Sequence, residues 1–140
     1  DGKGRTSLPS RFRQAIEGQA ESRLMLTTGL DGCVVAYPLP EWNAFEARLS
    51  TLPQFDESVT MLRRIYVSGA VECDVDKLGR ILIPSHLRKH GNLQRDVLWA
   101  GMGPHMELWD KERYDSLWQG VLGDSEKRQA MVKRLAELGL

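Results

Sequence analysis

The residues best suited to chemistry in this sequence lie in two short basic segments of matching composition. Residues 1–13 read Asp-Gly-Lys-Gly-Arg-Thr-Ser-Leu-Pro-Ser-Arg-Phe-Arg, and residues 76–88 read Asp-Lys-Leu-Gly-Arg-Ile-Leu-Ile-Pro-Ser-His-Leu-Arg. Asp, Gly, Arg, Pro, Ser and the final Arg are identical between the two at one constant offset, that from Asp1 to Asp76. Such a repeat within 140 residues indicates two related halves in a pseudo-twofold arrangement.

The Gly-Arg pair in each segment predicts a contact with DNA bases. Gly4 and Gly79 allow a close backbone turn, so that Arg5 and Arg80 can project from the end of a strand. The planar guanidinium group of arginine matches the N7 and O6 acceptors that guanine presents in the major groove. We therefore assign base readout to Arg5 and Arg80.

The other charged residues of the two segments suit supporting roles. Phosphate contacts, which set the register of a protein on DNA, are predicted for Lys3, Arg13, Lys77, Arg88 and Lys89. Asp1 and Asp76 are assigned to holding the turn or orienting the arginine, because a carboxylate facing phosphate would be repelled. The alternative is that each Asp–Arg pair only closes its own turn as a surface salt bridge, which contributes little stability.

The distribution of charge supports a basic surface on a chain without net charge. The chain has 19 Lys and Arg against 19 Asp and Glu. Residues 1–13 and 76–90 each hold four cations and one acid, a net charge of +3. A neutral protein can therefore present one basic face. No apolar run approaches the roughly 18 residues of a membrane span, and we expect a cytoplasmic, nucleoid-associated protein without membrane contact.

The elements that position these segments are predicted to repeat as well. Each half runs strand, turn, short helix, strand, hairpin, strand, helix, which makes the fold class α+β. Pro84 opens a helix that Gly91 ends at its C′ position, and hairpin turns are predicted at 29–32 and 101–104. A strand over 70–75 precedes the second segment. Its counterpart for the first segment is expected before residue 1, or an edge is left open.

The predicted organisation has four parts. They are a first half (1–51), a connecting segment with a helix (52–69), a second half (70–120) and a C-terminal amphipathic helix (121–140). The connecting helix is expected to begin near Ser58 and to place Met61, Leu62, Ile65 and Tyr66 on one apolar face. The apolar stripe of the C-terminal helix, formed by Met131, Leu135 and Leu138, is expected to pack back on the domain or to meet another subunit.

Other constellations in the sequence are weaker. His86 and His90 have the i, i+4 spacing of a metal pair, but the sequence places no third ligand nearby, so solvated or phosphate-facing histidines are favoured and no metal or cofactor is expected. Cys33 and Cys73 lack CxxC neighbours and predict buried free thiols in a reducing compartment. The tryptophans, Trp42, Trp99, Trp109 and Trp118, favour core and interface packing over base stacking.

On these residues the chain resembles the MraZ family of bacterial regulators. The resemblance covers essentially the whole chain and rests on Asp1/Arg5 and Asp76/Arg80 as two Asp-x-x-x-Arg motifs, with the segments 37–42 and 107–110. It implies two tandem AbrB-type swapped-hairpin halves that form a double-split β-barrel. It also implies ring-shaped homo-oligomers that bind short G-rich direct repeats upstream of the operon for cell division and cell-wall synthesis, and repress it together with their own gene.

Two other classes of function are open to such a chain. Swapped-hairpin domains also serve as antitoxins, and the helix over 124–140 could bind a partner protein in that role. A catalytic function would need an arrangement of nucleophile and base, and no Ser/His/Asp or Cys/His spacing in the sequence is suggestive. We therefore expect a protein that is not an enzyme.

Overall fold

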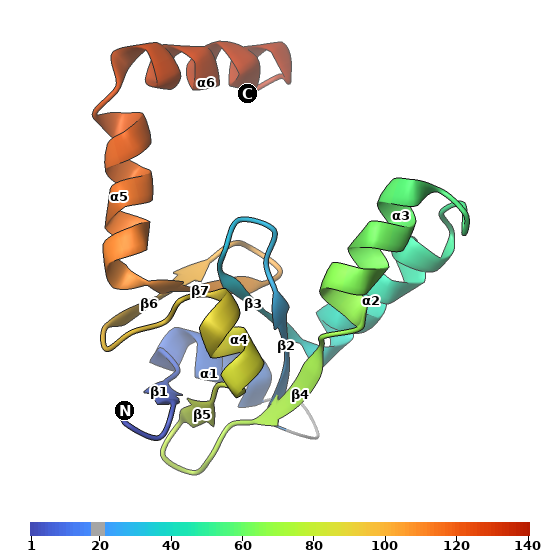
Figure 1. The fold of residues 1–140 in the computed structure, drawn as a ribbon, viewed down its shortest axis with the longest axis vertical. Coiled ribbons are helices and arrows are strands. Elements are labelled where there is room, and N and C mark those ends of the chain that lie inside the picture. The colour runs from blue at the N-terminus through green and yellow to red at the C-terminus, as the bar shows by residue number, and fades with distance from the viewer. Residues whose placement is uncertain (18–21) are drawn as a thin grey trace. The chain divides into compact units, whose positions relative to one another are not determined.

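The structure is a computed structural model that describes residues 1–17 and 22–140, and its fold is α+β (Figure 1). The strands are β1 (Arg5–Ser7), β2 (Arg23–Thr28), β3 (Val34–Pro38), β4 (Val71–Asp74), β5 (Arg80–Leu82), β6 (Val97–Gly101) and β7 (Met106–Asp110). The helices are α1 (Ser10–Glu17), α2 (Leu39–Ser50), α3 (Glu57–Leu62), the π-helical turn η1 (Arg63–Val67), α4 (Ser85–His90), α5 (Lys111–Leu122) and α6 (Ser125–Glu137). The chain divides into two compact units, 1–110 and 111–140.

The larger sheet of the first unit is antiparallel, with strand order β4-β2-β3-β7-β6. The predicted hairpins join β2 to β3 and β6 to β7, and Gly32 and Gly103 take the positive φ angles (82° and 89°) that their turns require. The equivalent strands β3 and β7 pair with each other at the centre, with Val35 opposite Glu107. Among the described residues β6 pairs with β7 alone, whereas its counterpart β2 pairs with both β3 and β4.

The two basic segments meet in a separate two-stranded sheet. Strands β1 and β5 pair antiparallel, with Thr6 opposite Ile81. The pairing is extended reciprocally, because the Leu8 amide donates to the Gly79 carbonyl at 2.8 Å and the Ile83 amide donates to the Gly4 carbonyl at 2.9 Å. Segments from opposite halves of the sequence are thus held side by side, about a local pseudo-twofold axis.

The core of the first unit anchors both basic segments. Leu8, Ile81 and Leu87 are almost fully buried, together with Leu24 and Leu108 of the larger sheet. Burying a side chain of this size stabilises the folded state by roughly 1.5–3 kcal/mol. The apolar residues that alternate with the basic ones therefore fix the position of β1, β5 and the helices that follow them.

The end of α4 differs by one residue from the prediction that Gly91 is at the C′ position. Gly91 is the C-cap, with a right-handed φ of −78°, and Asn92 takes the positive φ of 46°. Asparagine tolerates this conformation better than most residues. A Cβ at Gly91 would lie 3.2 Å from Cγ of Leu93, a tight contact that needs a small shift of that side chain.

The predicted connecting helix is confirmed, but the prediction of which residues form its apolar face is partly wrong. The Asp56 carboxylate accepts hydrogen bonds from the amides of Ser58 (2.8 Å) and Val59 (3.2 Å) and so caps α3, which continues into η1. Val59 is the buried residue of α3, while the side chain of Met61 is 49% exposed. The π-helical turn changes the angular spacing of successive residues, so a strict 3.6-residue pattern does not describe this face.

The second unit consists of α5 and α6. The predicted C-terminal helix is confirmed, and Asp124 caps it by accepting from the amides of Glu126 (3.0 Å) and Lys127 (3.2 Å). About half of the surface of several apolar side chains in this unit is exposed; they are Leu117, Trp118, Leu122, Met131, Val132 and Leu138. Within the described part of the chain, every helix is too short or too polar to cross a membrane.

Candidate nucleic-acid interface

Each basic segment begins with a tight turn built on its aspartate. One carboxylate oxygen of Asp1 accepts from the amides of Lys3 (2.8 Å) and Arg5 (3.2 Å). The equivalent oxygen of Asp76 accepts from the amides of Leu78 and Arg80, both at 2.9 Å. The residue before each arginine has a positive φ angle, 85° at Gly4 and 76° at Gly79, which glycine adopts without a steric penalty.

The second carboxylate oxygen of each aspartate holds the arginine of the same turn. Oδ2 of Asp1 lies 2.9 Å from Nη2 of Arg5, and Oδ2 of Asp76 lies 3.1 Å from Nε of Arg80. The Arg80 amide and, less strongly, its guanidinium and the Leu78 amide lower the pKa of Asp76 below its usual 3.8. The carboxylate is therefore ionised near neutral pH, and each guanidinium group is fixed at the beginning of its strand while about a third of the side chain is exposed.

The helix arginines cross over and cover the turn of the opposite segment. A Cβ added to Gly4 would lie 2.0 Å from Nη1 of Arg88, and a Cβ added to Gly79 would lie 2.3 Å from Nη1 of Arg13. A side chain at either glycine would therefore displace the arginine that lies over it. Arg13 and Arg88, which were predicted to contact phosphates, are half-buried. Each packs against the backbone of the turn in the other basic segment.

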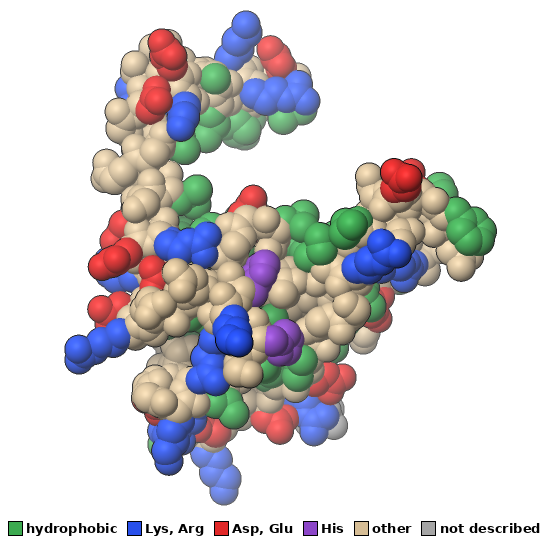
Figure 2. All heavy atoms as spheres, viewed as in Figure 1, with side chains coloured by type: hydrophobic (Ala, Val, Ile, Leu, Met, Phe, Trp, Pro, Cys, Tyr) green, Lys and Arg blue, Asp and Glu red, His purple; other side chains and the backbone are tan. Residues whose placement is uncertain are grey.

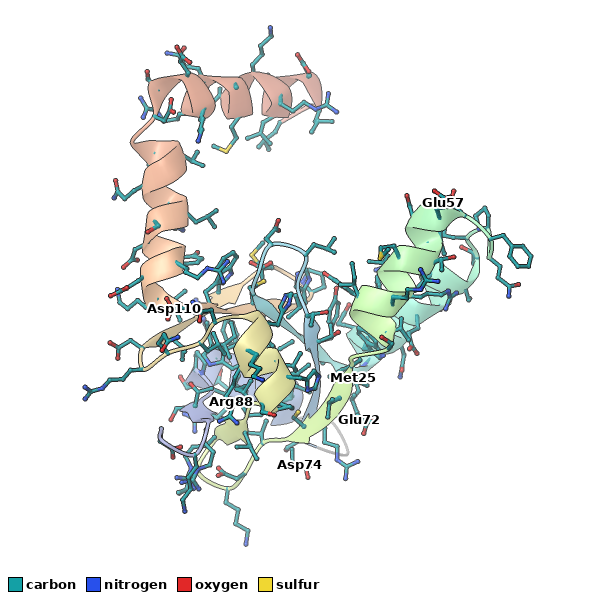
Figure 3. The ribbon with its side chains drawn as sticks, in the orientation of Figure 1. Met25, Glu57, Glu72, Asp74, Arg88 and Asp110 are labelled. Atoms are coloured by element: carbon teal, nitrogen blue, oxygen red, sulfur yellow. The ribbon has the colours of Figure 1, made fainter. Side chains whose placement is uncertain are left out.

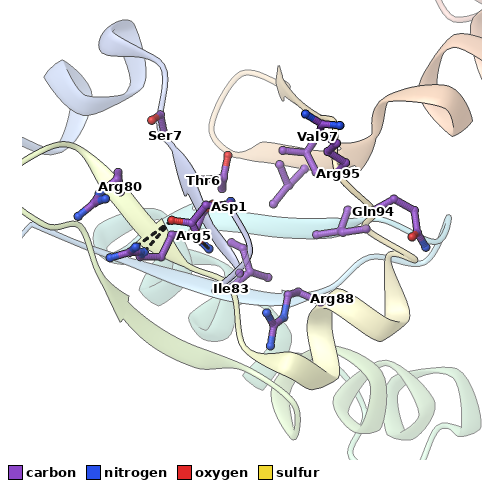
Figure 4. A pocket seen from close by; sticks show the side chains of 13 residues that line it. Asp1, Arg5, Thr6, Ser7, Arg80, Ile83, Arg88, Gln94, Arg95 and Val97 are labelled. Atoms are coloured by element: carbon purple, nitrogen blue, oxygen red, sulfur yellow. Dashed lines mark hydrogen bonds and ion pairs between the residues drawn. The ribbon is translucent and has the colours of Figure 1, made fainter.

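Arginines from both segments, Arg5, Arg80 and Arg88, line one groove of about 380 Å³ in the first unit (Figure 4). Its polar lining comprises Asp1, Arg5, Thr6, Ser7, Arg80, Arg88, Gln94 and Arg95. Arg5 comes from β1, Arg80 from β5, Arg88 from α4, and Gln94 and Arg95 from the segment before β6. Four guanidinium groups and one carboxylate line this groove among the described residues, so it attracts anions.

The remaining predicted residues lie outside this groove. Arg13, Asp76, Lys77 and Gly79 line a smaller cavity of about 110 Å³, and Lys89 borders a third, open one together with Arg88. Lys3 is exposed beside the first turn. Lys and Arg side chains are prominent at the end of the unit that carries β1 and β5 (Figure 2, lower left).

Sequence reasoning missed Gln94 and Arg95. They follow α4 and lie outside the repeated basic segments, although Arg95 matches Arg23 at the same offset that aligns Val97 of β6 with Met25 of β2. Extending the repeat toward the residues before each strand would have identified this pair of arginines.

The histidines of α4 each contact a backbone carbonyl group. Nε2 of His86 lies 3.1 Å from the Gly69 carbonyl, and Nε2 of His90 lies 2.8 Å from the Gly29 carbonyl, so each ring donates a hydrogen bond. Both side chains are also exposed, in line with the predicted solvated histidines. The described residues contain no group of three His, Cys, Asp or Glu placed to hold a metal ion.

Both cysteines and two of the tryptophans are buried in the first unit. Cys33 and Cys73 are buried and free, as predicted, and burial raises the pKa of Cys33 to about 12 and of Cys73 to about 11. Trp42 and Trp109 are buried, which confirms core packing for both. Trp42 packs edge-on against Tyr37 with ring centroids 5.4 Å apart.

Comparison with known proteins gives matches over most of the chain. A family described as "MraZ protein, putative antitoxin-like" matches residues 1–65 and again residues 66–135. Proteins named "Transcriptional regulator MraZ" from Burkholderia cenocepacia (strain HI2424) and Burkholderia mallei (strain SAVP1) are each 42% identical over 122 residues. Each alignment covers 87% of this chain and 84% of the relative.

Proposed function

We propose that this chain, which belongs to the MraZ family, regulates transcription by binding DNA through its paired basic segments. The observation that carries the proposal is the pair of Asp–Arg turns at Asp1/Arg5 and Asp76/Arg80. They share the same hydrogen bonds and ion pair and begin neighbouring strands of one small sheet. The role is regulatory and not enzymatic.

In this mechanism Arg5 and Arg80 read bases while the other cations hold the backbone. The carboxylates of Asp1 and Asp76 restrict each guanidinium before DNA arrives, which lowers the entropy lost on binding. Arginine held in this way can donate two hydrogen bonds to one guanine. We propose that five cations contact phosphates and so set affinity and salt dependence: Lys3, Arg13, Lys77, Arg88 and Lys89.

Membership of the MraZ family also suggests the architecture of the halves, the operator and the location of the protein. We propose that residues 1–51 and 70–120 are AbrB-type swapped-hairpin halves of a double-split barrel. The reciprocal contacts of Arg13 with Gly79 and of Arg88 with Gly4 support halves that interlock. The proposed operator consists of G-rich direct repeats upstream of the division and cell-wall operon, which the protein represses together with its own gene. Its proposed location is cytoplasmic and nucleoid-associated.

A ring-shaped homo-oligomer is proposed as the binding form. The apolar side chains exposed on α5 and α6 support a contact between subunits, because a patch of this kind on a monomer marks an interaction surface. The same helices could instead bind another protein, in line with the antitoxin-like description of the family. Light scattering of the purified chain distinguishes the two: the ring requires an oligomer, while a monomer that co-purifies with a small partner supports the alternative.

The function is tested by comparing Arg80→Ala with Lys77→Ala on a G-rich repeat duplex. Arg80→Ala is expected to lose roughly 1–3 kcal/mol of specific binding, with the fold intact by circular dichroism. Lys77→Ala is expected to weaken all sequences alike and to reduce the salt slope by about one unit. A folded Arg80→Ala variant that binds as well as the parent contradicts the assignment. A change of sequence preference in Lys77→Ala would make Lys77 a base reader.

A further inference from the structure

The second basic segment carries two exposed leucines where the first segment has polar residues. The side chain of Leu78 is 69% exposed and that of Leu82 is 54% exposed. The offset that aligns the two segments places Lys3 at the position of Leu78, and Ser7 at the position of Leu82. The two Asp–Arg turns share the same hydrogen bonds, so the chemical difference between the segments lies in the side chains beside them.

The outer face of the small sheet places one of these leucines next to an arginine proposed to read a base. Ile81 is fully buried, and side chains alternate along a strand, so Arg80 and Leu82 lie on the opposite, outer face of β5. In the sheet register Arg5 lies opposite Leu82, and Ser7 lies opposite Arg80. Because directly opposite residues share a face and are neighbours across the strands, Leu82 stands beside Arg5.

The other leucine is part of the turn that holds the second arginine. The amide of Leu78 donates a hydrogen bond to the Asp76 carboxylate at 2.9 Å, and the Arg80 amide donates to the same oxygen. The turn therefore fixes the backbone of Leu78 two residues before Arg80. Each arginine proposed to read a base thus has an exposed leucine near it.

The exposure of these leucines is a property of their positions in the repeat. Lys3 and Ser7, at the equivalent positions, are exposed in the presence of β4, which carries Glu72 (Figure 3). By the pseudo-twofold relation, a strand that corresponds to β4 in the first half would leave Leu78 and Leu82 exposed as well. Single exposed leucines are common on protein surfaces, but these two lie in a basic segment among cations.

An apolar side chain on a surface that contacts DNA has a base-specific partner in the major groove. Thymine presents a C5 methyl group there, whereas guanine presents the N7 and O6 acceptors that arginine binds. Leucine beside arginine therefore matches a thymine next to a guanine. Lys3 and Ser7 end in polar groups, so the first segment lacks this match.

We propose that Leu78 and Leu82 contact the C5 methyl groups of thymines adjacent to the guanines that Arg80 and Arg5 read. The inference rests on the proposed DNA binding and adds thymine to the bases that the protein recognises. It makes the two leucines specificity-determining residues, while the arginines and the surrounding cations supply the contacts already described.

The test replaces thymine by deoxyuridine, which removes the C5 methyl group and leaves base pairing and charge unchanged. Fluorescence anisotropy measures binding of the chain to a duplex of G-rich direct repeats with thymine beside the guanines, and to the same duplex with deoxyuridine at those positions. The parent is expected to bind the thymine duplex about fourfold more tightly for each methyl group contacted, the effect of burying one methyl-sized group. The salt slope should be the same for both duplexes, because no charge changes.

Variants of the leucines assign the methyl contact to its residues. Leu78→Ala and Leu82→Ala should each reduce the preference for thymine, and the double variant should bind both duplexes equally. Leu30→Ala is the matched control, because Leu30 is 63% exposed in the hairpin between β2 and β3, away from β1 and β5 (Figure 1). This control should keep the preference of the parent.

Three results would overturn the inference while specific binding persists. The parent could prefer the repeats over a scrambled duplex and still bind the thymine and deoxyuridine duplexes equally. The preference for thymine could survive in the double variant, which would assign it to another group. The double variant could change the oligomer size in light scattering and keep the preference, which would place the leucines between subunits. A parent without preference for the repeats overturns the proposed function itself, so the two failures are distinguishable.

Discussion

The contact between Gly79 and Arg13 predicts an energetic coupling between two residues that are far apart in the sequence. A Cβ at Gly79 would lie 2.3 Å from Nη1, 2.5 Å from Cδ and 2.9 Å from Cζ of Arg13. Normal contacts of this kind are about 3.5–4.0 Å, so the arginine must be displaced. The φ of 76° adds a second cost, roughly 1–2 kcal/mol for a residue with a side chain.

Gly79→Ala should therefore destabilise the folded chain through strain and through displacement of Arg13. In an Arg13→Ala background the clash is absent and only the strain remains. The double variant should be more stable than the sum of the two single effects, by a coupling energy in the range of about 0.5–3 kcal/mol for residues in contact. Urea denaturation of the parent, both single variants and the double variant, at one protein concentration, measures this energy.

Gly103→Ala is the matched control for the coupling. Gly103 has a similar φ of 89°, but a Cβ there would meet no atom within 4 Å. Its effect should add to that of Arg13→Ala within about 0.3–0.5 kcal/mol, as expected for independent sites. If Gly79→Ala and Arg13→Ala add equally well, the arginine does not occupy the space above the opposite turn, and the crossed arrangement of the two segments is refuted.

The pKa shifts give two further predictions. Because the folded pKa of Asp76 is below its usual 3.8, the ionised carboxylate stabilises the fold above about pH 4, and this stability is lost as the pH falls through the folded pKa. Asp76→Asn should therefore reduce the loss of stability at acid pH. An unchanged loss in this variant would refute the turn hydrogen bonds as its source. Burial raises the pKa of Cys33 from 9.0 to about 12 and of Cys73 to about 11, so stability should fall as the pH rises above 9, where only the unfolded thiols ionise. At pH 8 neither thiol should react with a disulfide reagent until denaturant is added, and rapid labelling of the native chain would contradict their burial.

Local chemistry made much of the fold predictable from the sequence. The repeat at Asp1 and Asp76, the glycines of the hairpin turns and Pro84 at the start of a helix each act within a few residues, so the strands and helices beside them were predicted. The end of α4 was misplaced by one residue because Asn92, and not Gly91, takes the positive φ angle, which asparagine also tolerates.

The arrangement of the candidate site depended on pairing across the chain. The sequence identified Arg13 and Arg88 as basic residues of a helix, but not that each lies over the glycine of the other segment. That contact follows from the pairing of β1 with β5, which no local pattern specifies. Arg95 was missed for a related reason, since the groove it borders is built from segments that are far apart in the sequence.

The measurement that tests specific DNA binding most directly is fluorescence anisotropy of the unmodified chain with two duplexes at two salt concentrations. One duplex carries spaced G-rich direct repeats, and the other has the same bases in scrambled order. Specific readout by Arg5 and Arg80 predicts tighter binding to the repeats at both salt concentrations, with a preference that survives when added salt weakens the phosphate contacts. Equal affinity for both duplexes, lost together as salt is raised, would show a basic surface alone and contradict base readout.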